Sequence, residues 1–223
     1  MRIALFGGTF NPVHYGHLRI AQEVIEDGSV DKIVFVPAYA PPHKPEAHVA
    51  DAADRLAMLA LAIKGNERFA LSDIEIGRGE TSYTIDTLRQ IKENPPEDFK
   101  GYGELTLSLI VGSDAFNDIN SWCEYEDIFR LASIIVVTRP GFAVKKPGEV
   151  LPVELARKFW YDSDTQSYQN SYGNSLIYLS TTLIGISSSD IRERIRDGSS
   201  VRYMMPDDVL EYIRSKDLYR QGS

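Results

Sequence analysis

The sequence is poor in cysteine and in long apolar runs. Cys123 is the single cysteine among 223 residues, so the chain cannot close an internal disulfide, and we expect a reducing, cytoplasmic location. We expect Cys123 to be a packed small side chain and not a nucleophile. Residues 2–6 are apolar but too short for a signal peptide, and nothing approaches a transmembrane span. We therefore expect no signal peptide and no membrane partner.

Positive charge is scarce as well. Lys and Arg number 24 against 32 for Asp and Glu, which gives a net charge of −8 and a pI near 5.1. Nucleic acid is therefore not the expected partner, because proteins that bind it usually carry a basic face. An anionic substrate stays open, since local cations and backbone dipoles set the field in a cleft. With 43% hydrophobic and 25% charged residues, the composition is that of one globular domain.

Two familiar phosphate-binding loops are missing, since neither GxGxxG nor GxxxxGK[ST] occurs. Residues 7–17 instead read GGTFNPVHYGH, directly after an apolar run that predicts a buried strand. Gly7 and Gly8 lack a Cβ, so we expect the backbone to turn sharply there and to approach a ligand closely.

The helix expected after this turn suits an anion. Its first turn presents unpaired backbone N–H groups and the positive end of the helix dipole. His14 and His17, spaced i, i+3, face the same way across that helix start. The segment therefore predicts a phosphate site. The alternative is an N-terminal hairpin with two incidental histidines.

Strand-like and helix-like segments alternate along most of the chain, which predicts a parallel sheet flanked by helices. We expect an α/β fold: a Rossmann-like, doubly wound parallel sheet with helices on both faces and a small C-terminal helical subdomain. The expected strands span residues 2–6, 32–36, 69–76, 105–111, 134–138 and 175–179. The expected helices run through residues 18–25, 56–63, 188–196 and 206–215, with another that starts near Tyr83.

The chain is expected to form a core from residues 1–185 and a C-terminal helical segment, residues 186–223, of the same domain. Within the core, residues 142–174 are polar and aromatic without a clean period, so we expect an irregular insertion there. Ligands of open parallel sheets bind outside the carboxyl ends of the strands. The glycine turn, the PPHK loop, Asp114 and Arg139 all follow expected strands, so they should converge on one edge.

A second phosphate signal, GISSSDIRERIRDG, lies near the C-terminus. Ser187, Ser188 and Ser189 are suited to cap a helix N-terminus, and Ser187 with Asp190 resembles a capping box. Arg192 follows in the first turns of the expected helix, which makes the helix start a second place for a phosphate. The alternative is a well-capped surface helix with solvated arginines.

These two segments together resemble a known superfamily. GGTFNPVHYGH resembles the [GS]xFxPxHxGH signature of the nucleotidyltransferases related in fold to class I aminoacyl-tRNA synthetases, and ISSSDIR resembles their ISSTxIR signature. PPHK, TSYTIDTL, GSD, Trp122, RPG and RYMMPDDVLEYI are similar to bacterial nicotinate-nucleotide adenylyltransferases. The resemblance covers nearly the whole chain except residues 142–174. Asn11 stands where that family usually has Asp, and Ser189 where it often has Thr; both keep size and hydrogen-bonding capacity.

The resemblance implies an enzyme that joins ATP to nicotinate mononucleotide and releases pyrophosphate. It implies catalytic roles for His14, His17 and Arg192. ATP would be bound by Gly7, Gly8, Thr9, Phe10, His14, His17, Gly112, Asp114, Ile186, Ser187, Ser188 and Arg192. Mg²⁺ would bridge phosphate oxygens and keep mostly waters, so no protein ligands to a metal are expected.

The resemblance also implies an acceptor site for nicotinate mononucleotide at Lys44, Ser82, Tyr83, Thr84, Trp122 and Arg139. Trp122 would offer an aromatic face to the pyridine ring, the alternative being core packing. Backbone N–H groups around residues 82–84 would bind the ring carboxylate. Lys44 would add a cation, the alternative being a solvated loop lysine. Asp114 would accept from a nucleotide hydroxyl, unless it only caps its helix; His43 is more doubtful than the first pair, and His48 reads as an exposed loop residue.

Other functions stay open at this point. The nearest are adenylyltransferases that act on nicotinamide mononucleotide or phosphopantetheine, or on both pyridine mononucleotides. A non-catalytic nucleotide sensor is the alternative from another class, although both end motifs are intact. A tRNA synthetase is excluded, because the chain is short, acidic and without a KMSKS-like loop. The choice between a monomer and a homo-oligomer stays undecided.

Overall fold

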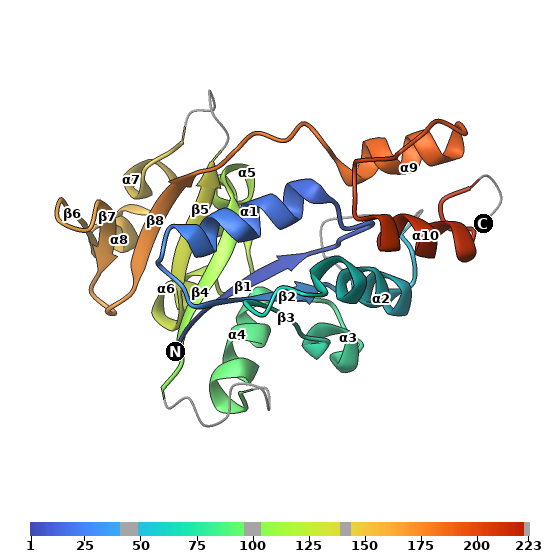
Figure 1. Cartoon of the computed structure of the whole chain (residues 1–223). Coiled ribbons are helices and arrows are strands. Elements are labelled where there is room, and N and C mark those ends of the chain that lie inside the picture. Colours follow the sequence, from blue (N-terminus) through green and yellow to red (C-terminus); the bar gives the residue numbers. More distant parts are fainter. Residues whose placement is uncertain (41–48, 96–103, 139–143, 221–223) are drawn as a thin grey trace.

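A computed structural model describes residues 1–40, 49–95, 104–138 and 144–220. At its centre is an eight-stranded sheet in the order β3-β2-β1-β4-β5-β8-β7-β6 (Figure 1). The parallel strands are β1 (Arg2–Gly8), β2 (Lys32–Pro37), β3 (Phe69–Leu71), β4 (Thr106–Gly112), β5 (Ser133–Thr138) and β8 (Ser175–Ser180). The strands β6 (Phe159–Asp162) and β7 (Ser167–Asn170) extend one edge in antiparallel pairing.

Helices cover both faces of this sheet, because the buried strands are apolar on both sides. In β1, Ile3 and Leu5 join one core, whereas Ala4 and Phe6 join the other. The first core is covered by α4 (Thr84–Glu93), α5 (Ser113–Asn117), η2 (Ile119–Ser121), α6 (Tyr125–Leu131), α7 (Pro147–Val150) and α8 (Val153–Ala156). The second is covered by α1 (Tyr15–Glu26), α2 (Ala52–Ile63), α9 (Ser188–Arg196) and α10 (Asp207–Ser215). The doubly wound fold is confirmed.

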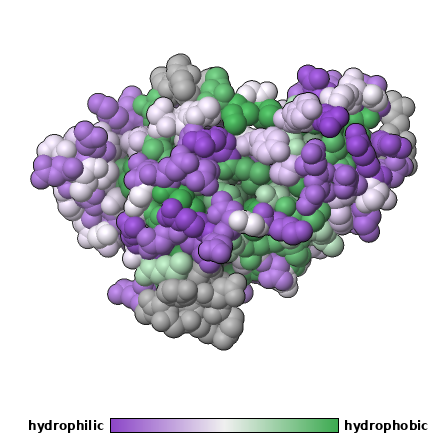
Figure 2. Space-filling view, in the orientation of Figure 1, coloured by the Kyte–Doolittle hydropathy of each residue, from purple (hydrophilic) through white to green (hydrophobic). Residues whose placement is uncertain are grey.

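The surface is consistent with this layering. Figure 2 shows a largely hydrophilic surface on the side of α1 and α10, with apolar residues visible mainly in its middle. Within the described ranges, every helix is too short or too polar to cross a lipid bilayer.

The segment expected as a strand over residues 69–76 is only partly a strand. The strand β3 ends at Leu71, and the helix α3 (Ile74–Arg78) begins three residues later. Glu75 lies in this helix, almost fully buried, and accepts a hydrogen bond from Thr87 Oγ1 at 2.7 Å. An apolar run this short does not distinguish a strand from a buried helix, and the tertiary contact of Glu75 decides for the helix.

The expectation of an irregular insertion at residues 142–174 is wrong for its described part, residues 144–174. That part contains α7, α8 and the β6–β7 hairpin, which joins the sheet through β8. Side-chain hydrogen bonds hold it, and these leave no periodic signal in the sequence. Asn170 Oδ1 accepts from the backbone N–H groups of Tyr172 and Asn174, at 2.9 and 3.1 Å, and its Nδ2 donates to Phe129 O at 3.1 Å.

Cys123 is exposed, so the expectation of a packed cysteine is also wrong. It follows η2 in a short connection to α6, where the chain turns away from the core. The assignment of residues 1–185 and 186–223 to one domain stays a prediction.

Asn170→Ala should lower the free energy of unfolding by about 2 kcal/mol, because two backbone N–H groups lose their acceptor and Phe129 O loses one of its two side-chain donors. Urea unfolding followed by circular dichroism would measure it. Ser171→Ala is the matched control, an exposed position in the same turn, and should change stability by less than about 0.5 kcal/mol. Equal effects of the two substitutions would contradict the role given to Asn170.

Candidate functional site

The site lies where the carboxyl ends of β1, β2, β4 and β5 meet at one edge of the sheet. Gly8 pairs with Pro37 there, and Gly112 pairs with Val137. Asp114 follows in the first turn of α5 and is exposed. A Cβ placed on Gly7 or Gly112 would meet no atom within 4 Å, so the space over both strand ends is open. Of the residues expected at this edge, His43, Lys44 and Arg139 lie outside the described residues, and so does His48, which was expected to be an exposed loop residue.

The sharp turn of the first motif occurs two residues after Gly8, later than expected. Gly7 and Gly8 belong to β1, and it is Phe10 that adopts a positive φ of 48°. Gly8 is needed for another reason, since a Cβ there would lie 3.0 Å from the Phe10 ring. The Phe10 ring is buried and packs edge-on against His17 at 5.0 Å between ring centroids. The Phe10 ring therefore restricts the position of the His17 ring by packing against it.

Hydrogen bonds to the backbone fix both histidine rings at the start of α1. The backbone N–H of Gly16 donates to His14 Nδ1 at 3.1 Å, and the backbone N–H of His14 donates to His17 Nδ1 at 3.3 Å. The two rings lie 3.8 Å apart between centroids. Because each Nδ1 accepts, the neutral form of each ring carries its proton on Nε2.

Burial gives His14 an unusual charge state. Its residue is only 6% exposed, and this desolvation lowers the pKa of the imidazole to about 4. At neutral pH, His14 is therefore an uncharged hydrogen-bond donor and not a cation.

The second motif contacts the first directly. Ser188 Oγ donates to Pro12 O at 2.9 Å, and Arg192 Nη1 donates to Asn11 O at 2.6 Å. Residues more than 170 positions apart thus form one structure at the start of α1 and α9. Ile186 O lies 3.7 Å from the position of a Cβ on Gly16, which places it beside the same turn.

The N-cap of α9 is only half of the expected capping box. Ser187 Oγ accepts from the backbone N–H of Asp190 at 3.1 Å, so the N-cap prediction is confirmed. The Asp190 carboxylate does not return to the cap residue but pairs with Arg194 at 3.0 Å, because an i, i+4 cation competes for it.

Arg55, which sequence reasoning missed, holds the first motif from the side of α2. Its side chain is 1% exposed, and its guanidinium donates to the backbone carbonyls of Thr9, Ala38, Tyr39 and Ala50 at 2.6–3.2 Å. Burial lowers its pKa. The sequence feature that could have revealed this role is the position of Arg55, an arginine beside the apolar residues of an amphipathic helix.

Tyr219 was also missed. Its hydroxyl donates to Asn11 Oδ1 at 2.7 Å, and the backbone N–H of Ala50 donates to the same oxygen at 3.0 Å. Burial raises the pKa of Tyr219, although the nearby Arg192 and Arg55 act in the opposite direction. A tyrosine beyond the last helix carries no sequence pattern that would have revealed this contact.

Three of the expected acceptor residues, Ser82, Tyr83 and Thr84, lie at the start of α4. Tyr83 is the N-cap residue and Thr84 the first helical residue, as expected. Ser82 has a structural role, because its Oγ accepts from the backbone N–H of Tyr39 at 2.9 Å and its N–H donates to Ala40 O at 3.1 Å. Trp122 is half-buried against the first core, so ring stacking and core packing both stay open for it.

In the part of the chain that the structure describes, no cluster of three or more His, Cys, Asp or Glu is arranged to hold a metal ion. The site is therefore built mainly from backbone groups, imidazoles, hydroxyls and arginines. This combination suits the binding of polyphosphate.

Known proteins are similar to this chain over nearly its whole length. A family model described as cytidylyltransferase-like matches residues 5–194. A protein of Citrifermentans bemidjiense named "probable nicotinate-nucleotide adenylyltransferase" is 44% identical over 219 residues, which cover 98% of both chains. The protein of the same name from Geotalea uraniireducens is 44% identical over 222 residues, 100% of both. Plasmodium falciparum nicotinic acid mononucleotide adenylyltransferase complexed with NaAD has the same fold, with a TM-score of 0.68 over 98% of this chain and 97% of that chain at 20% identity.

The depressed pKa of His14 should make stability depend on pH. The unfolded imidazole takes up a proton below about pH 6.5, whereas the folded one does so only near pH 4, so acidification favours unfolding. The contribution is fully present above pH 6.5 and amounts to about 3 kcal/mol lost by pH 4. Urea unfolding of wild type and His14→Asn, which keeps an N-cap side chain, would isolate it. Parallel pH profiles for the two proteins would contradict the assignment.

Tyr219→Phe should destabilise the protein by about 1 kcal/mol, because a buried oxygen of Asn11 loses one of its donors. Chemical unfolding would measure the change. Tyr203→Phe is the matched control, since Tyr203 is 76% exposed, and should be neutral within about 0.5 kcal/mol. A neutral Tyr219→Phe would show that the contact adds nothing to the fold.

Proposed function

This chain belongs to the nicotinate-nucleotide adenylyltransferases of the cytidylyltransferase-like family, and we propose that it transfers the adenylyl group of ATP to nicotinate mononucleotide. The products are deamido-NAD and pyrophosphate, so the protein acts in NAD biosynthesis. The observation that carries the proposal is the direct contact between the two motifs, through Ser188 and Arg192. It brings two helix N-termini and both histidines to one edge of the sheet.

The reaction needs placement and charge neutralisation more than a protein nucleophile. A phosphate oxygen of nicotinate mononucleotide forms a bond to the α-phosphorus of ATP, and the bond from that phosphorus to the bridging oxygen breaks. His14 and His17 donate from Nε2 to the triphosphate oxygens that gain charge. Because the pKa of His14 is about 4, it acts as a neutral donor and keeps its proton.

The β- and γ-phosphates bind at the start of α9, where the backbone N–H groups of Ser188 and Ser189 and the hydroxyl of Ser187 lie together. A guanidinium has five N–H donors, and Arg192 uses Nη1 for Asn11 O and Nη2 for Ser189 Oγ. The remaining N–H donors of Arg192 can bind a phosphate while Nη1 stays hydrogen-bonded to Asn11 O. Arg192 thus binds the leaving group while it holds the first motif.

The adenosine of ATP lies along the open strand ends at Gly7 and Gly112, with Asp114 accepting from a nucleotide hydroxyl. Thr9 and Phe10 contribute through their backbone, since the Phe10 ring is buried beneath His17. Gly8 and Ile186 complete this wall, Gly8 by leaving room for Phe10.

Nicotinate mononucleotide lies on the side of α4, with its ring carboxylate against the backbone N–H groups of Tyr83 and Thr84. Two or more N–H donors favour a carboxylate over the carboxamide of nicotinamide, which must turn its own donors away. Trp122 offers the ring face, and Ser82 fixes the loop. Lys44 and Arg139 stay predictions for the acceptor phosphate.

Mg²⁺ would be bound together with ATP, and Asp114 and the phosphate-binding groups would hold the complex. The described residues fit this form of binding, since they offer phosphate donors and the exposed Asp114 without a cage of carboxylates. When bound, the ion supplies charge neutralisation on the triphosphate. We also propose a cytoplasmic location, on the basis of the single cysteine.

The proposal predicts pyrophosphate release from Mg-ATP with nicotinate mononucleotide, far above that with nicotinamide mononucleotide or phosphopantetheine. His17→Ala should lower kcat by about 10²–10³, as expected for loss of one positioned donor to developing charge. Gln22→Ala, on the same helix α1, is the matched control and should retain full activity. An enzyme-coupled pyrophosphate assay, with the three acceptors in parallel, gives both comparisons.

Two outcomes would contradict the proposal in different ways. Equal kcat/KM for the two pyridine mononucleotides would refute the nicotinate selectivity but keep the reaction. Binding of ATP without turnover of any acceptor would favour a nucleotide sensor.

A further inference from the structure

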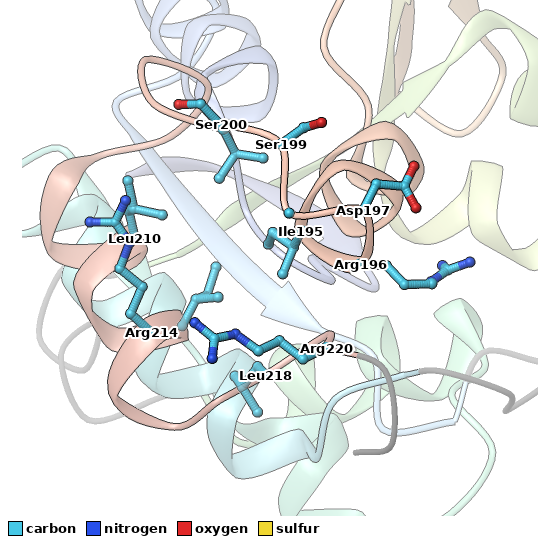
Figure 3. Close-up of a pocket in the computed structure, with 12 residues that line it drawn as sticks. Ile195, Arg196, Asp197, Ser199, Ser200, Leu210, Arg214, Leu218 and Arg220 are labelled. Atoms are coloured by element: carbon cyan, nitrogen blue, oxygen red, sulfur yellow. The ribbon is translucent and has the colours of Figure 1, made fainter.

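A second cavity, of about 840 Å³, lies at the opposite end of α9 from the candidate site. The start of α9 contacts Asn11 and Pro12, whereas its end, Ile195 and Arg196, lines the cavity. The other walls come from residues 197–201, from α10 and from the segment after α10 (Figure 3). The volume is within the range of about 300–1,000 Å³ that small-molecule sites occupy.

The lining of this cavity combines an apolar floor with a polar rim. The floor includes Val201, Leu210 and Ile213, all buried. Figure 3 shows the side chain of Arg214 extending along α10 toward Leu210, that of Arg220 lying beside Leu218, the two serines of residues 199–200 on another side, and Arg196 extending away from the rest. An apolar floor with a few polar groups is the usual composition of a site for an organic ligand.

The rim of the cavity carries more positive than negative side chains, whereas the chain as a whole is acidic. The side chain of Arg214 has no hydrogen-bond or ion-pair partner among the described residues. Arg220 pairs with Asp217 at 2.8 Å, but both side chains are more than 60% exposed, so this pair is weak and open to competition. The lining includes three arginines, Arg196, Arg214 and Arg220, against one carboxylate, Asp197, in a protein whose net charge is −8. Guanidinium groups of this kind suit a phosphate.

We propose that this cavity is a second binding site, for a nucleoside monophosphate or a similar organic phosphate with a flat apolar body. The phosphate lies against Arg214, in a cavity that Arg220, Ser199 and Ser200 also line. The base lies on the floor formed by Leu210 and its neighbours. This site is separate from the one proposed for adenylyl transfer, and its binding does not depend on that function.

The position of the cavity connects it to the first motif. Leu218 and Arg220 line it, and Tyr219 between them donates to Asn11 Oδ1. The wall on the other side is α9, and Arg192 of this helix donates a hydrogen bond to Asn11 O. A ligand between these two walls changes the positions of both groups that hold Asn11. Occupancy should therefore alter turnover without competing with ATP.

Photolabelling with 8-azido-AMP, followed by peptide mapping, tests where the nucleotide binds. We expect label within residues 195–220 in wild type and in His17→Ala, and about tenfold less in Arg214→Gln, since one charge-assisted hydrogen bond is worth about that factor. Arg202→Gln is the matched control: Arg202 lies on the same connection, stacks on Tyr203 and does not line the cavity. It should label as wild type does. Circular dichroism would verify that both variants fold.

Label confined to the peptides of residues 7–17 and 187–192, or undiminished in Arg214→Gln, would overturn the proposal. The link to the first motif has its own readout. AMP should inhibit or activate pyrophosphate release with a component that is non-competitive with ATP and is absent in Arg214→Gln. Purely competitive inhibition in both proteins would refute the link, whereas the labelling result stands even if adenylyl transfer is not the activity.

Discussion

The backbone carbonyls of residues 9–12 need hydrogen-bond donors, and the arrangement of the site depends on how the chain supplies them. A turn that leaves a sheet edge buries carbonyl groups away from water, and each unpaired one is costly. Here Arg55 satisfies Thr9 O, Arg192 satisfies Asn11 O and Ser188 satisfies Pro12 O. The donors come from α2 and α9, so the packing of both helices on the second core fixes the turn.

This solution determines the electrostatics of the site. The donors that hold the turn include two guanidiniums, whose acceptors in the turn are neutral carbonyl oxygens, although Asp51 lies near enough to Arg55 to interact with its charge. A triphosphate placed at the same edge meets this charge in a partly desolvated setting, where it acts more strongly than in water. The protein can be acidic as a whole and still bind a polyanion, because Arg55 and Arg192 are held locally by neutral groups.

The sequence predicts those features of this structure that depend on residues close together in the chain. The parallel strands, the helix at residues 188–196 and the Ser187 cap follow from period and capping chemistry over a few residues, and the structure confirms them. Arg55 and Tyr219 contact residues 46 and 208 positions away, and no local pattern reports such partners. The β6–β7 hairpin was missed because hydrogen bonds of Asn170 stabilise it instead of an alternating apolar face.

The same reasoning explains Asn11, which departs from the usual Asp of the family. The hydroxyl of Tyr219 and the backbone N–H of Ala50 both donate to its Oδ1, and both are neutral donors. An amide oxygen accepts from them with the same geometry as a carboxylate oxygen. A carboxylate would add a negative charge close to Arg192, whose guanidinium binds the carbonyl of the same residue. The amide therefore preserves the connection from the C-terminal segment to the turn and leaves the charge of Arg192 available to a phosphate.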